Sequence, residues 1–346
     1  LRTGDIGYTT ADELLAASIT EVASKKTGIP LLKALYGTSA IAYTPGKSTQ
    51  LMDIKPWVES AFPILMGAKG NTLAMAGTQG TARYAAFGVP PTDLFKASQS
   101  LGFEAPFGRL LAWLFSGDAL NTTSLTTSRT VALSMTSSTA CGSSVPDETS
   151  SGSRNNFKAW IAQKYPTWKV VDCNTVSALA TCYSPATLIV TDGGSSTETD
   201  AAAVRQAVSA VMTAGKPVLY LHTGTWGSNK VSETVAALMN FSMPYGGNWW
   251  AIDAASRTNV SAMQTAIWDQ QGLGGIEKML AHFKAMDYSM AADLTTEFYA
   301  GANKVRSAMT ALDENKVNLF TQAGTSRVYR LLALLGDSYR QSVRFP

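Results

Sequence analysis

The sequence contains few of the residues that usually carry catalysis or bind metals. Among its 346 residues there are two histidines, His222 and His282, and three cysteines. It has no HExxH helix, no pair of histidines at helical spacing and no CxxC pair. Phosphate-loop, dinucleotide-binding and nucleophile-elbow patterns are absent as well. We therefore expect neither a zinc site nor a bound cofactor in this chain.

Charge and long apolar runs are also scarce. Charged residues make up 15% of the chain, against about 25% in an average soluble protein. The 28 basic and 25 acidic residues nearly balance, so no nucleic-acid partner is expected, because that needs a clustered basic excess. No run reaches the roughly 18 apolar residues of a membrane-spanning helix. Polar, uncharged loops and a 45% hydrophobic content favour a folded extracellular protein over a disordered one.

The cysteines are Cys141, Cys173 and Cys182. Cys173 and Cys182 flank a short segment, and a disulfide between them is expected in an oxidising compartment. The alternative is three reduced, half-buried thiols, and a disulfide would leave Cys141 without a partner. No signal peptide is recognisable and Leu1 is not an initiator methionine, so we expect a piece of a longer polypeptide.

The first part of the chain combines helices, a buried loop and a pair of strands. Thr10 and Glu13 form a capping box for a helix over residues 10–27, which Gly28 is expected to end. Residues 56–68 are apolar but contain two prolines, which favours a buried loop leading into short strands. Further on we expect two strands that turn at Gly80, followed by a helix: 71–77, 81–88 and 107–116.

From residue 129 to 225 the patterns of strand and helix alternate. The expected strands are 129–135, 168–173, 186–194 and 217–224, and the expected helices are 155–165 and 197–215. Near-continuous apolar runs such as TLIV and VLYL are typical of strands covered on both faces. The fold class is therefore α/β, a mainly parallel sheet with helices on both faces, as in flavodoxin-like proteins.

Residues after 256 show only helical spacing, and no further strand is expected there. We accordingly predict an α/β domain over residues 1–250 and an all-α domain over residues 256–346.

Two strand ends are the candidate ligand sites, because ligands of open α/β sheets bind beyond the carboxyl ends of the strands. Asp192, Gly193 and Gly194 follow one strand, and His222 follows another, with Trp226 shortly after it. Glycines there let a backbone approach a ligand. The alternative is two ordinary turns, with His222 packed against a neighbour.

Aromatic residues gather after the second strand end. Trp226, Trp249 and Trp250 lie in or just after the predicted loops, and flat aromatic rings suit stacking on sugars. The alternative is that these rings fill the core or a contact between domains. Trp57, Trp113, Trp160 and Trp268 lie in apolar patterns and are predicted to be core residues.

PVLYLHTG, residues 217–224, resembles the elbow strand of class I glutamine-amidotransferase-like domains. The resemblance places His222 where the family has its nucleophilic cysteine, and imidazole cannot form the thioester of amidotransfer. It therefore implies a degenerate domain without that activity.

A broader resemblance covers most of the chain. Residues 57–77, 81–90, 109–117 and 187–194 look like the N-terminal region of enhancin-like secreted bacterial metalloproteases. This class includes mucin-degrading accessory-colonization-factor and immunomodulating types. RLLALLGDSYRQSVRFP, residues 330–346, looks like the helical segment that precedes the protease domain. The resemblance implies that the zinc ligands lie downstream of this chain, and none is carried over to it.

The leading hypothesis is a non-catalytic accessory region of a secreted or cell-surface bacterial metalloprotease. Its expected partners are the downstream protease domain of the same polypeptide and mucin or another O-glycosylated protein. One alternative is a scaffold that binds no ligand. The other is a hydrolase that uses His222 with Asp192.

Overall fold

The computed structural model describes most of the chain between residues 28 and 243 and little beyond it. The described residues are 28–37, 41–43, 49–54, 60–66, 72–96, 101–135, 150–173, 175–192, 198–223, 230–243, 260–262 and 278.

Contacts within the chain divide it into two compact units. One comprises residues 28–54 and 61–264 and contains every helix and strand named below. The other comprises residues 1–27, 55–60 and 265–346 and lies almost entirely outside the described residues. The expected domain boundaries, 1–250 and 256–346, stay a prediction.

The first unit is built on a seven-stranded sheet with the strand order β3-β4-β5-β9-β8-β6-β7. Its strands are β3 (Ala61–Met66), β4 (Thr72–Gln79), β5 (Ala82–Phe87), β6 (Thr130–Ser134), β7 (Lys169–Asp172), β8 (Leu188–Thr191) and β9 (Val218–Leu221). β3, β4 and β5 pair antiparallel, and every pairing from β5 to β7 is parallel. The predicted mainly parallel α/β fold is confirmed.

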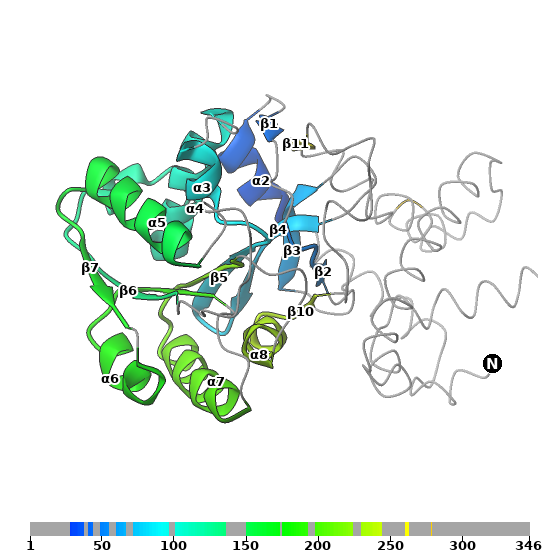
Figure 1. The fold of residues 1–346 in the computed structure, drawn as a ribbon. Coiled ribbons are helices and arrows are strands. Elements are labelled where there is room, and N and C mark those ends of the chain that lie inside the picture. Colours follow the sequence, from blue (N-terminus) through cyan, green and yellow to red (C-terminus); the bar gives the residue numbers. More distant parts are fainter. Residues whose placement is uncertain are drawn as a thin grey trace, which may run out of the picture. The chain divides into compact units, whose positions relative to one another are not determined.

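Helices cover both faces of this sheet (Figure 1). One face carries α2 (Gly28–Tyr36), α3 (Pro91–Lys96), α4 (Glu104–Ser116) and α5 (Ser150–Lys164). The other carries α6 (Leu179–Tyr183), α7 (Glu198–Thr213) and α8 (Lys230–Leu238). Short 3-10 turns are η2 (Leu101–Phe103), η3 (Thr122–Leu125) and η5 (Val176–Ala178). Because helices lie on both sides, all residues of β8 and β9 are buried, as their apolar runs predict.

An aromatic cluster fills the core between the sheet and the α3–α5 face. Phe107 of α4 meets Phe87 of β5 edge to face, with ring centroids 5.6 Å apart. It also packs against Phe95 at 5.9 Å and Trp160 at 5.2 Å. Trp160 is 7% exposed and Trp113 9%, so both predicted core assignments are confirmed. Trp57 and Trp268 lie outside the described residues.

The predicted loop over residues 56–68 is wrong where it covers β3. Pro63 lies within that strand, which is the edge of the sheet, and the register shifts just after it. An edge strand tolerates proline because one side of its backbone has no strand to donate to.

The prediction of no strand beyond residue 256 is wrong at β11 (Val260–Ala262). β11 pairs antiparallel with β1 (Ile41–Tyr43), and β2 (Asp53–Ile54) pairs with β10 (Phe241–Ser242) in a second small sheet. The helical spacing after residue 256 gave no sign of β11, because its partner lies more than 200 positions earlier in the sequence.

Gly28 was expected to end a helix, but it begins α2. Pro30 lies in the first turn of α2, where its missing N–H costs little, because the carbonyl four residues earlier lies before the helix begins. The predicted helix over residues 10–27 lies outside the described residues.

Candidate functional site

The carboxyl edge of the parallel strands is where the topology of an open α/β sheet usually places a ligand site. β7 lies on one side of β6, whereas β8 lies on its other side, so the strand order reverses between β6 and β8. At such a reversal the connecting helices leave the sheet on opposite faces, which opens a space between the strand ends. The described polar residues at this edge include Ser134, the last residue of β6, Asp192 after β8 and His222 after β9.

Ser134 and Tyr183 form one buried polar pair at this edge. The Ser134 Oγ and the Tyr183 hydroxyl share a hydrogen bond of 2.5 Å, and Ser134 also donates to the carbonyl oxygen of Val190 at 3.3 Å. Burial raises the pKa of Tyr183 to about 12, and the charge of Asp192 adds to this rise. Hydrogen bonds from Ser134 and Thr191 act in the opposite direction. The phenol is therefore protonated at neutral pH.

Asp192 is 2% exposed, and its carboxylate is held inside the protein. The hydroxyl of Thr223 donates to Asp192 Oδ2 at 2.7 Å, which joins the ends of β8 and β9. Thr223 is itself 4% exposed. Hydrogen bonds of this kind offset part of the cost of taking a charge out of water.

His222 is also 2% exposed. Its Nδ1 lies 2.7 Å from the Tyr220 hydroxyl, and its backbone N–H donates to the carbonyl oxygen of Phe87 at 2.9 Å. Burial raises the pKa of Tyr220 well above its usual value, and the Asp192 charge raises it further, whereas a hydrogen bond with Ser232 lowers it. The structure thus places the His222 side chain in the packed interior.

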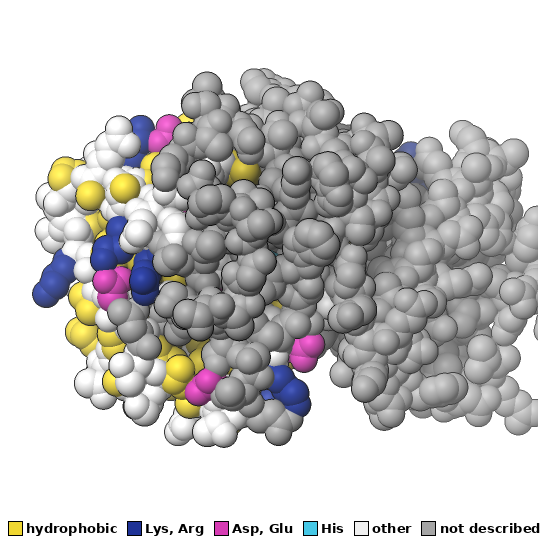
Figure 2. All heavy atoms as spheres, viewed as in Figure 1, with side chains coloured by type: hydrophobic (Ala, Val, Ile, Leu, Met, Phe, Trp, Pro, Cys, Tyr) yellow, Lys and Arg dark blue, Asp and Glu magenta, His cyan; other side chains and the backbone are white. Residues whose placement is uncertain are grey.

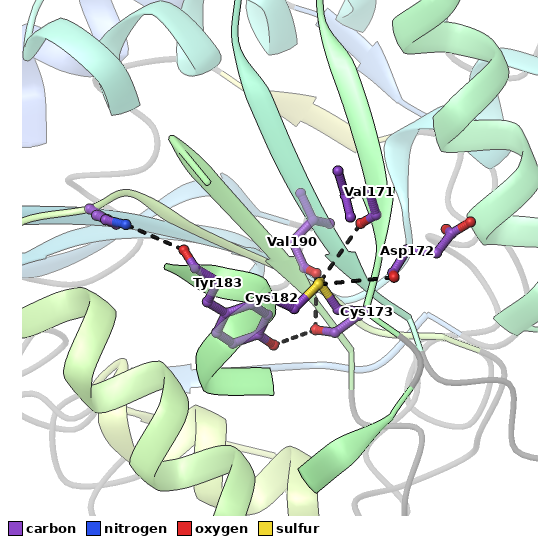
Figure 3. Close-up of a disulfide and its surroundings, with 8 residues drawn as sticks. Val171, Asp172, Cys173, Cys182, Tyr183 and Val190 are labelled. Carbon is purple, nitrogen blue, oxygen red and sulfur yellow. Dashed lines mark hydrogen bonds between the residues drawn. A yellow bond between two sulfur atoms is a disulfide. The ribbon is translucent and has the colours of Figure 1, made fainter. Parts of the chain in front are cut away.

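A disulfide joins Cys173, which follows β7, to Cys182 of α6. Their Cα atoms are 5.9 Å apart. Figure 3 shows Tyr183 beside this bond, so two neighbouring residues of α6 are fixed to the sheet, one covalently and one through Ser134. The bond stabilises the packing of α6 at the carboxyl edge. Cys141 lies outside the described residues.

Removing the disulfide is expected to lower the free energy of unfolding by about 2–3 kcal/mol, because the unfolded chain regains the freedom of a short loop. The two cysteines are nine positions apart. The measurement is thermal unfolding of a Cys173→Ser/Cys182→Ser double variant, with an expected fall in the midpoint of roughly 4–12 °C. Cys141→Ser is the control, since it removes the third thiol and leaves the bond. Equal midpoints for the two variants would contradict the prediction.

Five of the residues singled out in the sequence lie outside the described residues: Gly193, Gly194, Trp226, Trp249 and Trp250. Their assignment to a ligand site, and the stacking of the tryptophans on sugars, stay predictions. The likeness of residues 217–224 to an amidotransferase elbow also stays a prediction.

Ser134, Tyr183 and Tyr220 also belong to this edge, although the sequence patterns did not indicate them as site residues. Ser134 was detectable in principle, because it lies near the end of a predicted strand. Tyr183 could not be placed, since its position depends on how α6 packs against β6.

In the part of the chain that the structure describes, no three His, Cys, Asp or Glu side chains gather closely enough to hold a metal ion. The helices described there are too short or too polar to span a membrane. On the described part of the face shown in Figure 2, basic side chains lie beside acidic ones and form no large patch of one sign.

Comparison with known proteins gives a consistent result. Residues 31–249 match the family model of the immunomodulating metalloprotease N-terminal domain, and residues 277–346 match that of the immunomodulating metalloprotease helical domain. The second match agrees with the helical character predicted for the end of the chain.

A curated relative, the immunomodulating metalloprotease of Pseudomonas aeruginosa, is 25% identical over 366 aligned residues. The alignment covers 100% of this chain but only 37% of the relative.

Solved structures show the same fold. The IMPa metallopeptidase from Pseudomonas aeruginosa superposes with a TM-score of 0.64 at 22% identity, covering 98% of this chain and 37% of that one. Its complex with an O-glycopeptide gives the same values. The IMPa metallopeptidase in complex with T-antigen gives a TM-score of 0.64 at 21% identity, covering 94% of this chain and 36% of that one. The expected resemblance to secreted metalloproteases of the immunomodulating type is confirmed, and this chain belongs to the immunomodulating metalloprotease family through its N-terminal and helical domains.

Proposed function

We propose that this chain is the non-catalytic accessory region of a secreted or cell-surface metalloprotease. It positions a protease region of the same polypeptide and binds mucin-type O-glycoprotein. Family membership supports the connection to a metalloprotease, and the chain spans about 37% of the length of its curated relative.

The observation that supports a non-catalytic role is the burial and internal hydrogen bonding of Asp192 and His222. Each is 2% exposed and hydrogen-bonded within the core, Asp192 to Thr223 and His222 to Tyr220. A general base must reach the proton that it removes from a substrate. In this arrangement Asp192 links the end of β8 to the end of β9, and His222 is bonded to Tyr220 of β9 itself. Neither side chain is presented to a substrate, which disfavours the hydrolase alternative.

The proposed binding of O-glycoprotein is supported by the ligands of two solved relatives and by aromatic residues of this chain. Two solved relatives are described as complexes, one with T-antigen and one with an O-glycopeptide. In this chain, the predicted aromatic loops around Trp226 and Trp250 have the residue types that stack on sugars.

The test is binding of the 346-residue chain to immobilised mucin and to the same mucin after enzymatic removal of its O-glycans. We expect saturable binding that falls on deglycosylated mucin, with no cleavage of mucin in the presence of zinc. Trp226→Ala tests the aromatic loops, with Leu120→Ala, a change at an exposed apolar residue, as its control. Absence of saturable binding would favour the ligand-free scaffold, and zinc-dependent cleavage would overturn the non-catalytic assignment.

A further inference from the structure

A groove of about 730 Å³ lies away from the carboxyl edge. It is formed by α4, the end of α5, the turn that follows α5, and η3 with the residue after it. These segments lead into the amino ends of β6 and β7, which lie opposite the strand ends that hold Asp192 and His222. Its volume falls within the roughly 300–1,000 Å³ of small-ligand pockets. Its lining includes Glu104, Arg109, Leu125, Trp160, Lys164 and Tyr165.

One wall of the groove is aromatic and held in place. Tyr165 stacks on Trp168 with ring centroids 4.4 Å apart and planes 18° from parallel. Trp160 meets Tyr165 edge to face at 5.5 Å. The Trp168 Nε1–H donates to the carbonyl oxygen of Leu125 at 3.0 Å, which fixes the stack to η3, another segment that lines the groove. An apolar surface with this support loses little conformational entropy when a ligand binds.

The rim of the groove carries an ion pair. Lys164 Nζ lies 3.1 Å from Glu104 Oε1, which also accepts a hydrogen bond of 2.8 Å from Trp160 Nε1. Burial alone would raise the pKa of Glu104, but the hydrogen bonds from Trp160 and Lys164 and the Lys164 charge lower it. The side chains of Lys164 and Glu104 are 42% and 33% exposed, so both retain capacity for a ligand.

Tyr165 adds a neutral hydroxyl to this rim. Burial raises its pKa to about 12, and the Glu104 charge contributes to the rise. The groove therefore offers a carboxylate acceptor, an ammonium donor and a phenol. Arg109 adds a second cation to the lining, and its guanidinium donates to the carbonyl oxygens of Ala34 and Leu35.

This combination selects among ligand classes. A cation would be repelled by Lys164 and Arg109, and a purely apolar ligand would remove water from the ion pair without replacing its hydrogen bonds. A neutral sugar has both required surfaces, because its C–H face packs on aromatic rings and its hydroxyls bond to charged groups. We infer that this groove binds a neutral saccharide unit of an O-linked glycan, an inference that rests on the proposed glycoprotein binding.

The test is titration of the full chain with the T-antigen disaccharide, galactosyl-β1,3-N-acetylgalactosamine, followed by calorimetry and ligand-observed NMR. Lys164→Gln is expected to weaken binding about five- to tenfold, as loss of an exposed charge-assisted hydrogen bond should. Lys164→Arg is expected to retain most of the affinity. Mucin binding is measured in parallel with the same variants.

The matched control is Lys158→Gln. Lys158 is on the same helix, has a side chain 39% exposed and pairs with Asp172 at 2.6 Å, but it does not line the groove. Its substitution should leave disaccharide affinity unchanged. If Lys164→Gln binds as well as the unaltered chain, or if the disaccharide does not bind, the groove inference is wrong. If mucin still binds in that case, the proposed glycoprotein binding stands. If the unaltered chain does not bind mucin at all, both the groove inference and the proposed glycoprotein binding are wrong.

Discussion

We expect Phe107→Ala to lower the free energy of unfolding by about 3–5 kcal/mol, the cost of removing a large side chain from a packed core. Phe107 has no exposed surface and contacts the rings of Phe87, Phe95 and Trp160. These rings join the sheet, α3 and α5 around α4, so the resulting cavity would lie where four elements meet. Urea unfolding monitored by circular dichroism gives the free-energy difference.

Two comparisons make this prediction specific. Leu120→Ala removes an aliphatic side chain that is 64% exposed, and it should change stability by no more than about 0.5 kcal/mol. Phe107→Leu keeps most of the volume and should cost less than Phe107→Ala. A loss below about 1 kcal/mol for Phe107→Ala would mean that the aromatic cluster does not carry the core. Because Trp160 also lines the groove, Phe107→Ala is further expected to weaken saccharide binding there.

The parallel part of the sheet was predictable because its signals are local. β8 and β9 are short apolar runs bounded by turn residues, and α7 between them is long and periodic. The turn between β4 and β5 was equally clear, since Gly80 adopts a φ of 59° that few other residues tolerate.

Elements whose pairing partner is distant in sequence were not predictable in the same way. β11 is three residues long, and it is a strand because β1 lies beside it. β3 contains a proline, which argues against a strand unless the strand lies at an edge, and only the assembled sheet shows that it does. The local sequence shows neither that β11 pairs with β1 nor that β3 lies at the edge of the sheet.

In the candidate sites, too, local patterns were predictable and contacts between distant segments were not. The strand-end rule located Asp192 and His222, but the partner of Asp192 is 31 residues away and depends on the register of β8 against β9. The groove was not predicted at all. Its ion pair joins Glu104 and Lys164, which are brought together only when α4 packs against α5, and Trp160 was identified only as a core residue.

We expect Gly88→Ala to lower the free energy of unfolding by about 3 kcal/mol, at the upper end of the cost of overpacking a core. Gly88 follows β5, where its N–H donates to Leu73 and its carbonyl oxygen accepts from Gln50, each at 2.9 Å. A Cβ at this position would overlap the backbone carbonyl oxygen of Gln50. A backbone atom cannot rotate away as a side chain can, so both hydrogen bonds must distort.

The controls for Gly88→Ala separate this overlap from backbone strain and from side-chain crowding. Gly80→Ala meets no atom within 4 Å, and it should cost only the roughly 1–2 kcal/mol of a left-handed alanine. Gln50→Ala should not restore the stability of Gly88→Ala, because the obstructing atom belongs to the backbone of residue 50. Recovery in that double variant, or equal losses for Gly88→Ala and Gly80→Ala, would show that the close approach of residues 50 and 88 does not determine the requirement for glycine. Urea unfolding of the four chains decides between these outcomes, since it measures each loss against the same reference.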